Sequence, residues 1–167
     1  VDRLCAGGGV LDALCGSVGG VAGLKTRHDQ EVVPKGKLDG YTGRVFSGID
    51  AGSTTMKAAL VGEDGQLLHT WYGNNNGDIL GTAKVIMADF YNHIPAGCTI
   101  GHVTTTGYGE ALLIEALKAD SGEIETVAHL RGAKAFLPGV AFILDIAAHD
   151  LTCFPVTHGV LQHLLLH

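Results

Sequence analysis

Residues 48–57 read GIDAGSTTMK, and they join two short apolar stretches of the sequence, residues 45–49 and 58–61. Two such stretches separated by small polar residues predict a pair of strands joined by a hairpin. Gly52 leaves the turn free of a side chain, and the serine and two threonines that follow it add hydroxyl groups beside the backbone N–H groups. A turn of this composition predicts a binding site for a polyphosphate.

Two charged residues flank the turn. Asp50 ends the first predicted strand, where a carboxylate can hold the water shell of a magnesium ion that accompanies the phosphates. Lys57 begins the second strand and supplies a compact positive charge. The stretch is not a Walker phosphate loop, because the pattern G-x-x-x-x-G-K-[ST] occurs nowhere in the sequence. An ordinary hairpin with small polar turn residues is the alternative interpretation.

Composition is typical of a globular protein. The 167 residues are 46% hydrophobic and 17% charged, which suits one compact domain, or one domain with pieces of its neighbours. The formal net charge is −6 and the 11 basic residues are scattered along the chain. Without a basic stripe, the sequence predicts no nucleic-acid partner.

The cysteines have neither C-x-x-C spacing nor the density of a disulfide-bonded protein, so they predict reduced thiols and a cytoplasmic location. They lie at positions 5, 15, 98 and 153. Residues 1–24 are glycine-rich and include Asp2 and Asp12, a composition that suits neither a signal peptide nor a membrane helix. We therefore expect no membrane association.

The order of the predicted elements indicates an α/β fold. Residues 1–40 are predicted to be a glycine-rich N-terminal segment and linker. Predicted strands cover residues 44–50, 57–62, 66–72, 100–106, 140–146 and 151–156, and predicted helices cover residues 79–94, 112–117 and 123–136. Asp78 is expected to cap the first helix and Pro95 to end it. The order predicts a mixed sheet of three antiparallel strands plus parallel strands, with flanking helices.

Four segments carry a resemblance to a known family. They are GIDAGSTT at residues 48–55, TGYG at 106–109, EIETVAH at 123–129 and FILDI at 142–146. Together they resemble the ATPase activators of 2-hydroxyacyl-CoA dehydratases, which are related to the ATPase subunits of benzoyl-CoA reductase. The resemblance implies an actin-like ATPase (ribonuclease H-like) fold, with a first lobe at residues 41–139 and the start of a second lobe at residues 140–167.

The resemblance also implies a function. Such activators couple ATP hydrolysis to electron transfer onto a 2-hydroxyacyl-CoA dehydratase, and they are homodimers with a four-iron cluster between the subunits. Two phosphate loops, one from each lobe, grip the nucleotide, so that hydrolysis changes the angle between the lobes. The implied ligands are ATP or ADP with Mg²⁺, and the implied partners are a dehydratase and a second copy of the chain.

The residues of this site follow from the same resemblance. Asp50 and Asp145 are expected to hold Mg²⁺ through water, and Asp145, with His149, is a catalytic candidate. The residues expected to bind the nucleotide are Asp50, Gly52, Ser53, Thr54, Thr55, Lys57, Thr106, Gly107, Ala147 and Ala148.

The second loop departs from the family pattern. Where that pattern reads Asp-Ile-Gly-Gly-Gln-Asp, residues 145–150 read DIAAHD, so Ala147 and Ala148 replace glycines that would admit phosphate. His149 replaces an amide that could orient the attacking water. A degenerate, non-hydrolytic structural or assembly module is therefore an alternative function. A sugar or acyl-group kinase of the same superfamily is a third, less favoured because no substrate-binding acid is recognisable.

The sequence ends at His167, before the adenosine-binding segment and the cluster-ligating cysteines of a second lobe. We therefore expect the ligands of the implied iron–sulfur cluster to be absent from this sequence.

The remaining candidates have structural explanations. An exposed chain end is favoured over a metal site for His149, His158, His163 and His167. Asp120, Glu123 and Glu125 are expected to favour the start of a helix through its dipole. His129 is expected to be a packed or interlobe residue, and Gly132 to mark a close helix contact.

Overall fold

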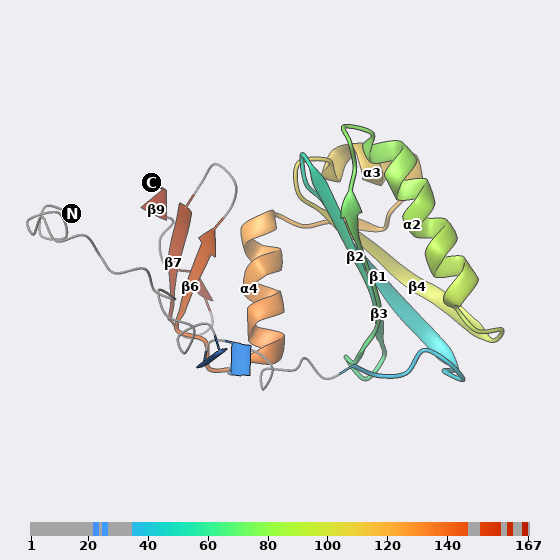
Figure 1. Cartoon of the computed structure of the whole chain (residues 1–167), viewed down its shortest axis with the longest axis horizontal. Coiled ribbons are helices and arrows are strands. Elements are labelled where there is room, and N and C mark those ends of the chain that lie inside the picture. Colours follow the sequence, from blue (N-terminus) through green and yellow to red (C-terminus); the bar gives the residue numbers. More distant parts are fainter. Residues whose placement is uncertain are drawn as a thin grey trace, which may run out of the picture. The chain divides into compact units, whose positions relative to one another are not determined.

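The computed structural model describes residues 22–23, 25–26, 35–146, 151–157, 160–161 and 165–166 (Figure 1). The chain divides into two compact units, Val1–Val33 and Pro34–His167. Every strand and helix labelled in Figure 1 belongs to the second unit.

A five-stranded mixed sheet forms the centre of this unit. Its strands, in the order β3-β2-β1-β4-β5, are β3 (Leu67–Asn74), β2 (Thr55–Gly62), β1 (Gly43–Ala51), β4 (Cys98–Thr106) and β5 (Ser121–Gly122). The first three in the chain are antiparallel, whereas β4 is parallel to β1 and β5 is parallel to β4. The predicted mixed sheet is confirmed, and the predicted bounds of its longer strands differ by one or two residues.

Helices α2 (Ile79–His93) and α3 (Glu110–Leu117) lie on the same side of the sheet (Figure 1). The Asp78 side chain accepts a hydrogen bond of 2.8 Å from the Gly81 N–H, which confirms the predicted cap of α2. Because a helix connects β3 to β4, the chain returns to the opposite end of the sheet and β4 can run parallel to β1.

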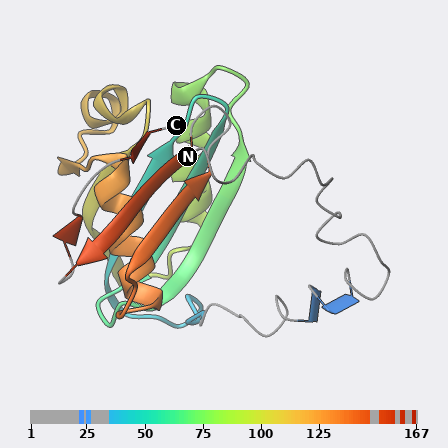
Figure 2. The ribbon, with the colours of Figure 1, turned by 90° about the vertical axis from the view of Figure 1, so that its left-hand side faces the viewer.

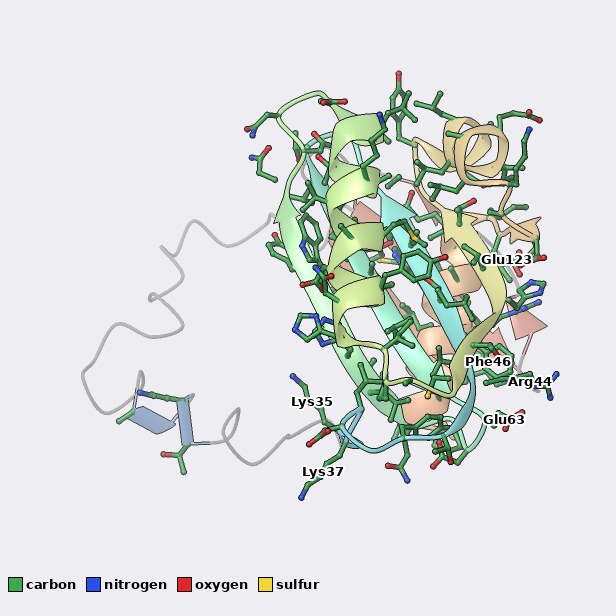
Figure 3. The ribbon with its side chains drawn as sticks, turned by 90° about the vertical axis from the view of Figure 1, so that its right-hand side faces the viewer. Lys35, Lys37, Arg44, Phe46, Glu63 and Glu123 are labelled. Atoms are coloured by element: carbon green, nitrogen blue, oxygen red, sulfur yellow. The ribbon has the colours of Figure 1, made fainter. Side chains whose placement is uncertain are left out.

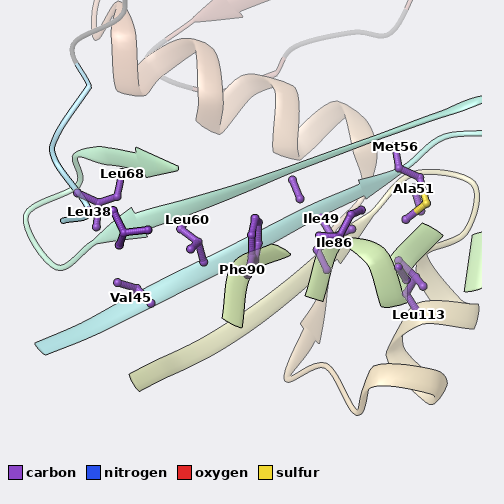
Figure 4. Close-up of a cluster of buried hydrophobic side chains, with 12 residues drawn as sticks. Leu38, Val45, Ile49, Ala51, Met56, Leu60, Leu68, Ile86, Phe90 and Leu113 are labelled. Atoms are coloured by element: carbon purple, nitrogen blue, oxygen red, sulfur yellow. The ribbon is translucent and has the colours of Figure 1, made fainter. Parts of the chain in front are cut away.

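The apolar face of α2 packs into the main hydrophobic core (Figure 4). The fully buried members of this core include Phe90 and Ile86 from α2, Ile49 and Val45 from β1, and Leu60 from β2. Burial of each such side chain contributes about 1.5–3 kcal/mol, so α2 and the antiparallel strands stabilise one another.

A second, smaller sheet follows α4 (Glu125–Phe136). It contains β6 (Phe142–Ile146), β7 (Leu151–Thr157), β8 (Val160–Leu161) and β9 (Leu165–Leu166). Strands β6 and β7 pair antiparallel, which confirms the predicted hairpin partners. Figure 2 shows α4 and these two strands on the same side of the five-stranded sheet. None of the helices in the described ranges combines the length and apolar character that crossing a bilayer requires.

Two expectations for α4 are wrong. The helix begins at Glu125 rather than residue 123, because the Glu123 N–H bonds to the Thr105 carbonyl and continues the pattern of the sheet. Ile124 is therefore the N-cap, without a side-chain hydrogen bond, and of the three acidic residues only Glu125 lies in the first turn. The Asp120 carboxylate instead accepts the Val103 N–H at 2.8 Å.

The second wrong expectation concerns Gly132. A Cβ added there would meet no atom of the described residues within 4 Å, so this glycine does not mark a close helix contact with them.

Candidate functional site

The β1–β2 hairpin presents its tip to solvent. Ala51 and Met56 are its last paired residues, and the Ser53 and Thr54 side chains at the tip are exposed. A Cβ added at Gly52 would lie 2.7 Å from the Thr55 carbonyl oxygen. The turn therefore requires glycine at this position, which leaves the neighbouring backbone accessible to an anionic ligand.

Asn75 supports this turn through hydrogen bonds, although no sequence pattern pointed to this residue. Its side chain is 2% exposed, and its Nδ2 donates a hydrogen bond of 2.8 Å to the Gly52 carbonyl. Its Oδ1 accepts the Gly77 N–H at 2.9 Å, and its own N–H bonds to the Thr54 carbonyl at 2.9 Å. Asn75 thus holds both ends of the turn tip, Gly52 through its side chain and Thr54 through its backbone N–H.

Replacing Asn75 with alanine is expected to lower the free energy of unfolding by about 2 kcal/mol, because two side-chain hydrogen bonds are lost at a buried position. Urea denaturation measures this change, and amide hydrogen exchange at residues 52–55 should become faster. Asn92→Ala, on the exposed side of α2, is the matched control and should change stability by less than about 0.5 kcal/mol. Equal losses for the two variants would contradict the role given to Asn75.

Asp50 carries the most unusual polar atom of the site. Its Oδ2 lies 3.1 Å from the Lys57 Nζ, whereas its Oδ1 is buried and has no hydrogen-bond partner among the described residues. Leaving a buried charged oxygen unpaired costs free energy, so the atom is suited to accept a hydrogen bond from a ligand or a bound water. Asp50 therefore fits a hydrated divalent cation, which donates such hydrogen bonds through its waters.

Gly107 approaches Asp50 from the end of β4. Its φ of +86° is unfavourable for other residues, and an added Cβ would lie 2.6 Å from Asp50 Oδ1 and 2.9 Å from the Ala51 carbonyl oxygen. Glycine is thus required at position 107, next to the carboxylate. The hairpin and the end of β4 together form one surface.

A cleft of about 630 Å³ lies beside this surface. Residues from four strands and α4 line it, and they include Asp50, Lys57 and Thr106 from the predicted nucleotide site. Thr106 Oγ1 donates a hydrogen bond of 2.6 Å to the Glu123 carbonyl, which ties β4 to the segment before α4. The structure therefore brings three of the predicted binding residues to one opening.

Glu123 lines the cleft and is not the N-cap of α4. Its Oε2 lies 3.0 Å from Arg131 Nη2, and both residues line the cleft. Figure 3 labels Glu123, and also Arg44 and Glu63, which form a separate ion pair of 2.8 Å. The sequence places an acid at residue 123, but its pairing with Arg131 depends on the position of α4.

The second predicted loop is only partly described. Asp145, at the end of β6, forms a hydrogen bond with His129 of α4, with 2.7 Å between Asp145 Oδ2 and His129 Nδ1. This contact confirms His129 as a packed residue between two elements, and Asp145 is not among the residues that line the cleft. The predictions for Ala147, Ala148, His149, His158, His163 and His167 lie outside the described residues.

Comparison with known proteins rests on structure alone, because no protein-family model and no curated protein matches the sequence. Among solved structures, the activator of the 2-hydroxyisocaproyl-CoA dehydratase from Clostridium difficile, with bound ADPNP, has 22% identity and a TM-score of 0.62. Component A of the (R)-2-hydroxyglutaryl-CoA dehydratase from Acidaminococcus fermentans has 24% identity and a TM-score of 0.64. The chain has the actin-like ATPase fold.

The extent of this similarity is limited. Each match covers 74% of the chain, but 45% of the activator from Clostridium difficile and 47% of component A from Acidaminococcus fermentans. The chain thus spans less than half the length of these two proteins. A ROK family glucokinase from Streptomyces griseus, in complex with glucose and AMPPNP, shares the fold at 16% identity and a TM-score of 0.52, over 71% of this chain and 46% of its own.

Proposed function

We propose that the chain supplies the first nucleotide-binding lobe of an ATP-dependent activator of a 2-hydroxyacyl-CoA dehydratase. The observation that carries the proposal is the buried, unpaired Oδ1 of Asp50, next to an exposed glycine turn and an open cleft. The two structurally similar activators, one of them with bound ADPNP, support the choice of nucleotide and partner.

Each residue of the turn has a defined part in this proposal. Ser53, Thr54 and Thr55 offer hydroxyl and backbone N–H donors to the phosphates, and Gly52 allows the phosphates to approach the backbone.

Lys57 and Asp50 lie opposite each other on the two strands, so the amine would reach the phosphates while the carboxylate would accept hydrogen bonds from metal-bound water. A bound Mg²⁺ neutralises phosphate charge. Asn75 keeps the turn in its binding conformation.

The proposal extends to ATP hydrolysis, which the activator would couple to electron transfer onto the dehydratase. Asp145 and His149 would act on the attacking water from the second loop, with Mg²⁺ held through water by Asp145. The contact between Asp145 and His129 supports a fixed orientation of that carboxylate. A homodimer and a cytoplasmic location remain predictions from the sequence.

The described residues do not fit a four-iron cluster. Such a cluster takes cysteine thiolates as its ligands, and the two described cysteines, Cys98 and Cys153, belong to different sheets. Cys98 Sγ also bonds to the Tyr41 carbonyl, at 2.9 Å. No step of the proposed function is therefore assigned to a cluster on these residues.

A non-hydrolytic module of the same fold is the second candidate function. Ala147 and Ala148 favour it, because a methyl group at either position takes space that a phosphate would need. In this case the first loop would still bind nucleotide, whereas hydrolysis would be absent.

Calorimetric titration with Mg²⁺·ATP and a phosphate-release assay test these functions together. We expect binding by the chain as it stands, and we expect Ala147→Gly with Ala148→Gly to bind more tightly because both methyl groups are removed. Binding with phosphate release supports the activator, and binding without release supports the non-hydrolytic module. If neither the chain nor the double variant binds Mg²⁺·ATP, the activator function is wrong and a structural or assembly module that does not bind nucleotide is favoured.

A further inference from the structure

We propose that His69, Asp89 and His93 form a binding site for a zinc ion. One ligand atom from each of these residues lies within 4.8 Å of the other two. None of the three lines the nucleotide cleft. The zinc site is therefore separate from the proposed ATP site and does not depend on it.

Distances among the ligand atoms suit tetrahedral zinc. Asp89 Oδ2 lies 2.7 Å from His69 Nε2, and Asp89 Oδ1 lies 3.4 Å from His93 Nδ1, which also donates a hydrogen bond of 2.7 Å to the Asp89 backbone carbonyl. Metal–ligand bonds of about 2.0–2.2 Å in a tetrahedron place neighbouring ligand atoms about 3.3 Å apart. To admit the ion, His69 and Asp89 would move apart by about 0.6 Å, and the His93 ring would rotate to exchange its hydrogen bond with the Asp89 carbonyl for a bond to the ion.

The backbone elements hold the three residues in place. Asp89 and His93 are four residues apart near the end of α2, so both side chains lie on one face of the helix. His69 lies in β3, where its backbone pairs with the buried Leu60 of β2. Its ring packs edge-on against Phe90, with centroids 5.8 Å apart, and stacks on the His93 ring at 4.4 Å. Both imidazoles are thus placed beside the same carboxylate before any ion binds.

The chemistry of the set selects among metals. Two imidazole nitrogens and one carboxylate oxygen are typical zinc ligands, whereas magnesium and calcium prefer sets made only of oxygen. The side chains of His69, Asp89 and His93 are 23%, 28% and 52% exposed. An ion can therefore enter from solvent, and water can occupy the fourth position.

Zinc at this site would connect β3, which is the edge strand of the five-stranded sheet, to the last turn of α2. An ion that binds the folded state and not the unfolded chain stabilises the fold by mass action. We therefore expect zinc to raise the thermal unfolding temperature of the protein. The alternative without metal is that Asp89 accepts hydrogen bonds from both imidazoles, from His69 with its carboxylate and from His93 with its backbone carbonyl.

Zinc binding is tested with the full chain, free of any purification tag and stripped with EDTA. Competition with a chromophoric chelator should give a site with a Kd of about 1 µM or tighter. Cobalt(II) bound in place of zinc should give the visible absorption bands of a tetrahedral site. His69→Gln and His93→Gln should each weaken binding at least about tenfold, remove the cobalt bands and abolish the thermal shift.

His102→Gln is the matched control. His102 Nδ1 also lies near a carboxylate, at 3.8 Å from Asp120, but among the described residues it has no stacked imidazole partner of the kind that His69 and His93 provide for each other. This variant should bind zinc like the unaltered chain, and it also tests for adventitious binding by histidines elsewhere. Circular dichroism checks that every variant folds, and His93 is exposed enough for its replacement to be tolerated.

Two results would overturn the proposal. One is a zinc affinity of the unaltered chain weaker than about 100 µM. The other is a zinc affinity and a cobalt spectrum that are unchanged in both His69→Gln and His93→Gln, since the ion would then be bound elsewhere.

Discussion

Replacing Asp50 with alanine is expected to weaken Mg²⁺·ATP binding at least tenfold while making the protein no less stable. The affinity falls because the carboxylate that accepts hydrogen bonds from metal-bound water is lost, an interaction worth about 1.5–3 kcal/mol. The stability holds or rises because the variant removes a buried, unpaired oxygen. The ion pair between Asp50 and Lys57 contributes little to stability, because the Lys57 side chain is 46% exposed. A residue that weakens the fold but supports binding is typical of a functional site.

Calorimetry and urea denaturation measure the two effects of Asp50→Ala. A titration with ATP in EDTA tests the role of Mg²⁺. Without the ion, the Asp50 carboxylate repels the phosphates, so the variant should bind free ATP at least as well as the unaltered chain. Glu63→Ala, which removes the exposed ion pair with Arg44, is the control and should change neither property. Unchanged Mg²⁺·ATP affinity in Asp50→Ala would contradict the assigned role.

Replacing Gly107 with alanine is expected to lower the free energy of unfolding by about 2–4 kcal/mol. A positive φ costs a residue with a side chain about 1–2 kcal/mol. The new methyl group would also meet Asp50 Oδ1 at 2.6 Å and the Ala51 carbonyl at 2.9 Å. The Ala51 carbonyl cannot move freely, because it accepts the Gly109 N–H at 2.9 Å.

Gly65→Ala separates the two contributions to the loss at Gly107. Gly65 has a φ of +80°, close to the +86° of Gly107, but an added Cβ there meets nothing within 4 Å. Gly65→Ala should therefore show only the backbone cost, and the difference between the two variants measures the crowding at Asp50. Equal losses of stability in urea denaturation would show that Gly107 is required for its backbone alone.

Local sequence signals predicted most of the fold correctly. The Asp64-Gly65 turn and the GIDAGSTT segment each join strands that pair with their neighbours in sequence, so the two hairpins follow from turn chemistry. Asp78 predicted the start of α2 because capping is also a local interaction. The start of α4 was misplaced because the Glu123 N–H bonds to Thr105 in a distant strand, which no local pattern reveals.

For the candidate site, the sequence named the residues but not their environment. The types and spacing of Asp50, Gly52 and Lys57 predict phosphate chemistry, because turns and strand ends are specified by residues close together in the chain. Three facts depend on residues far apart in the chain: the unpaired oxygen of Asp50, the support of the turn by Asn75, and the meeting of His69 with Asp89 and His93. Burial and long-range contacts are set by how strands and helices pack, so these features emerge only in the folded molecule.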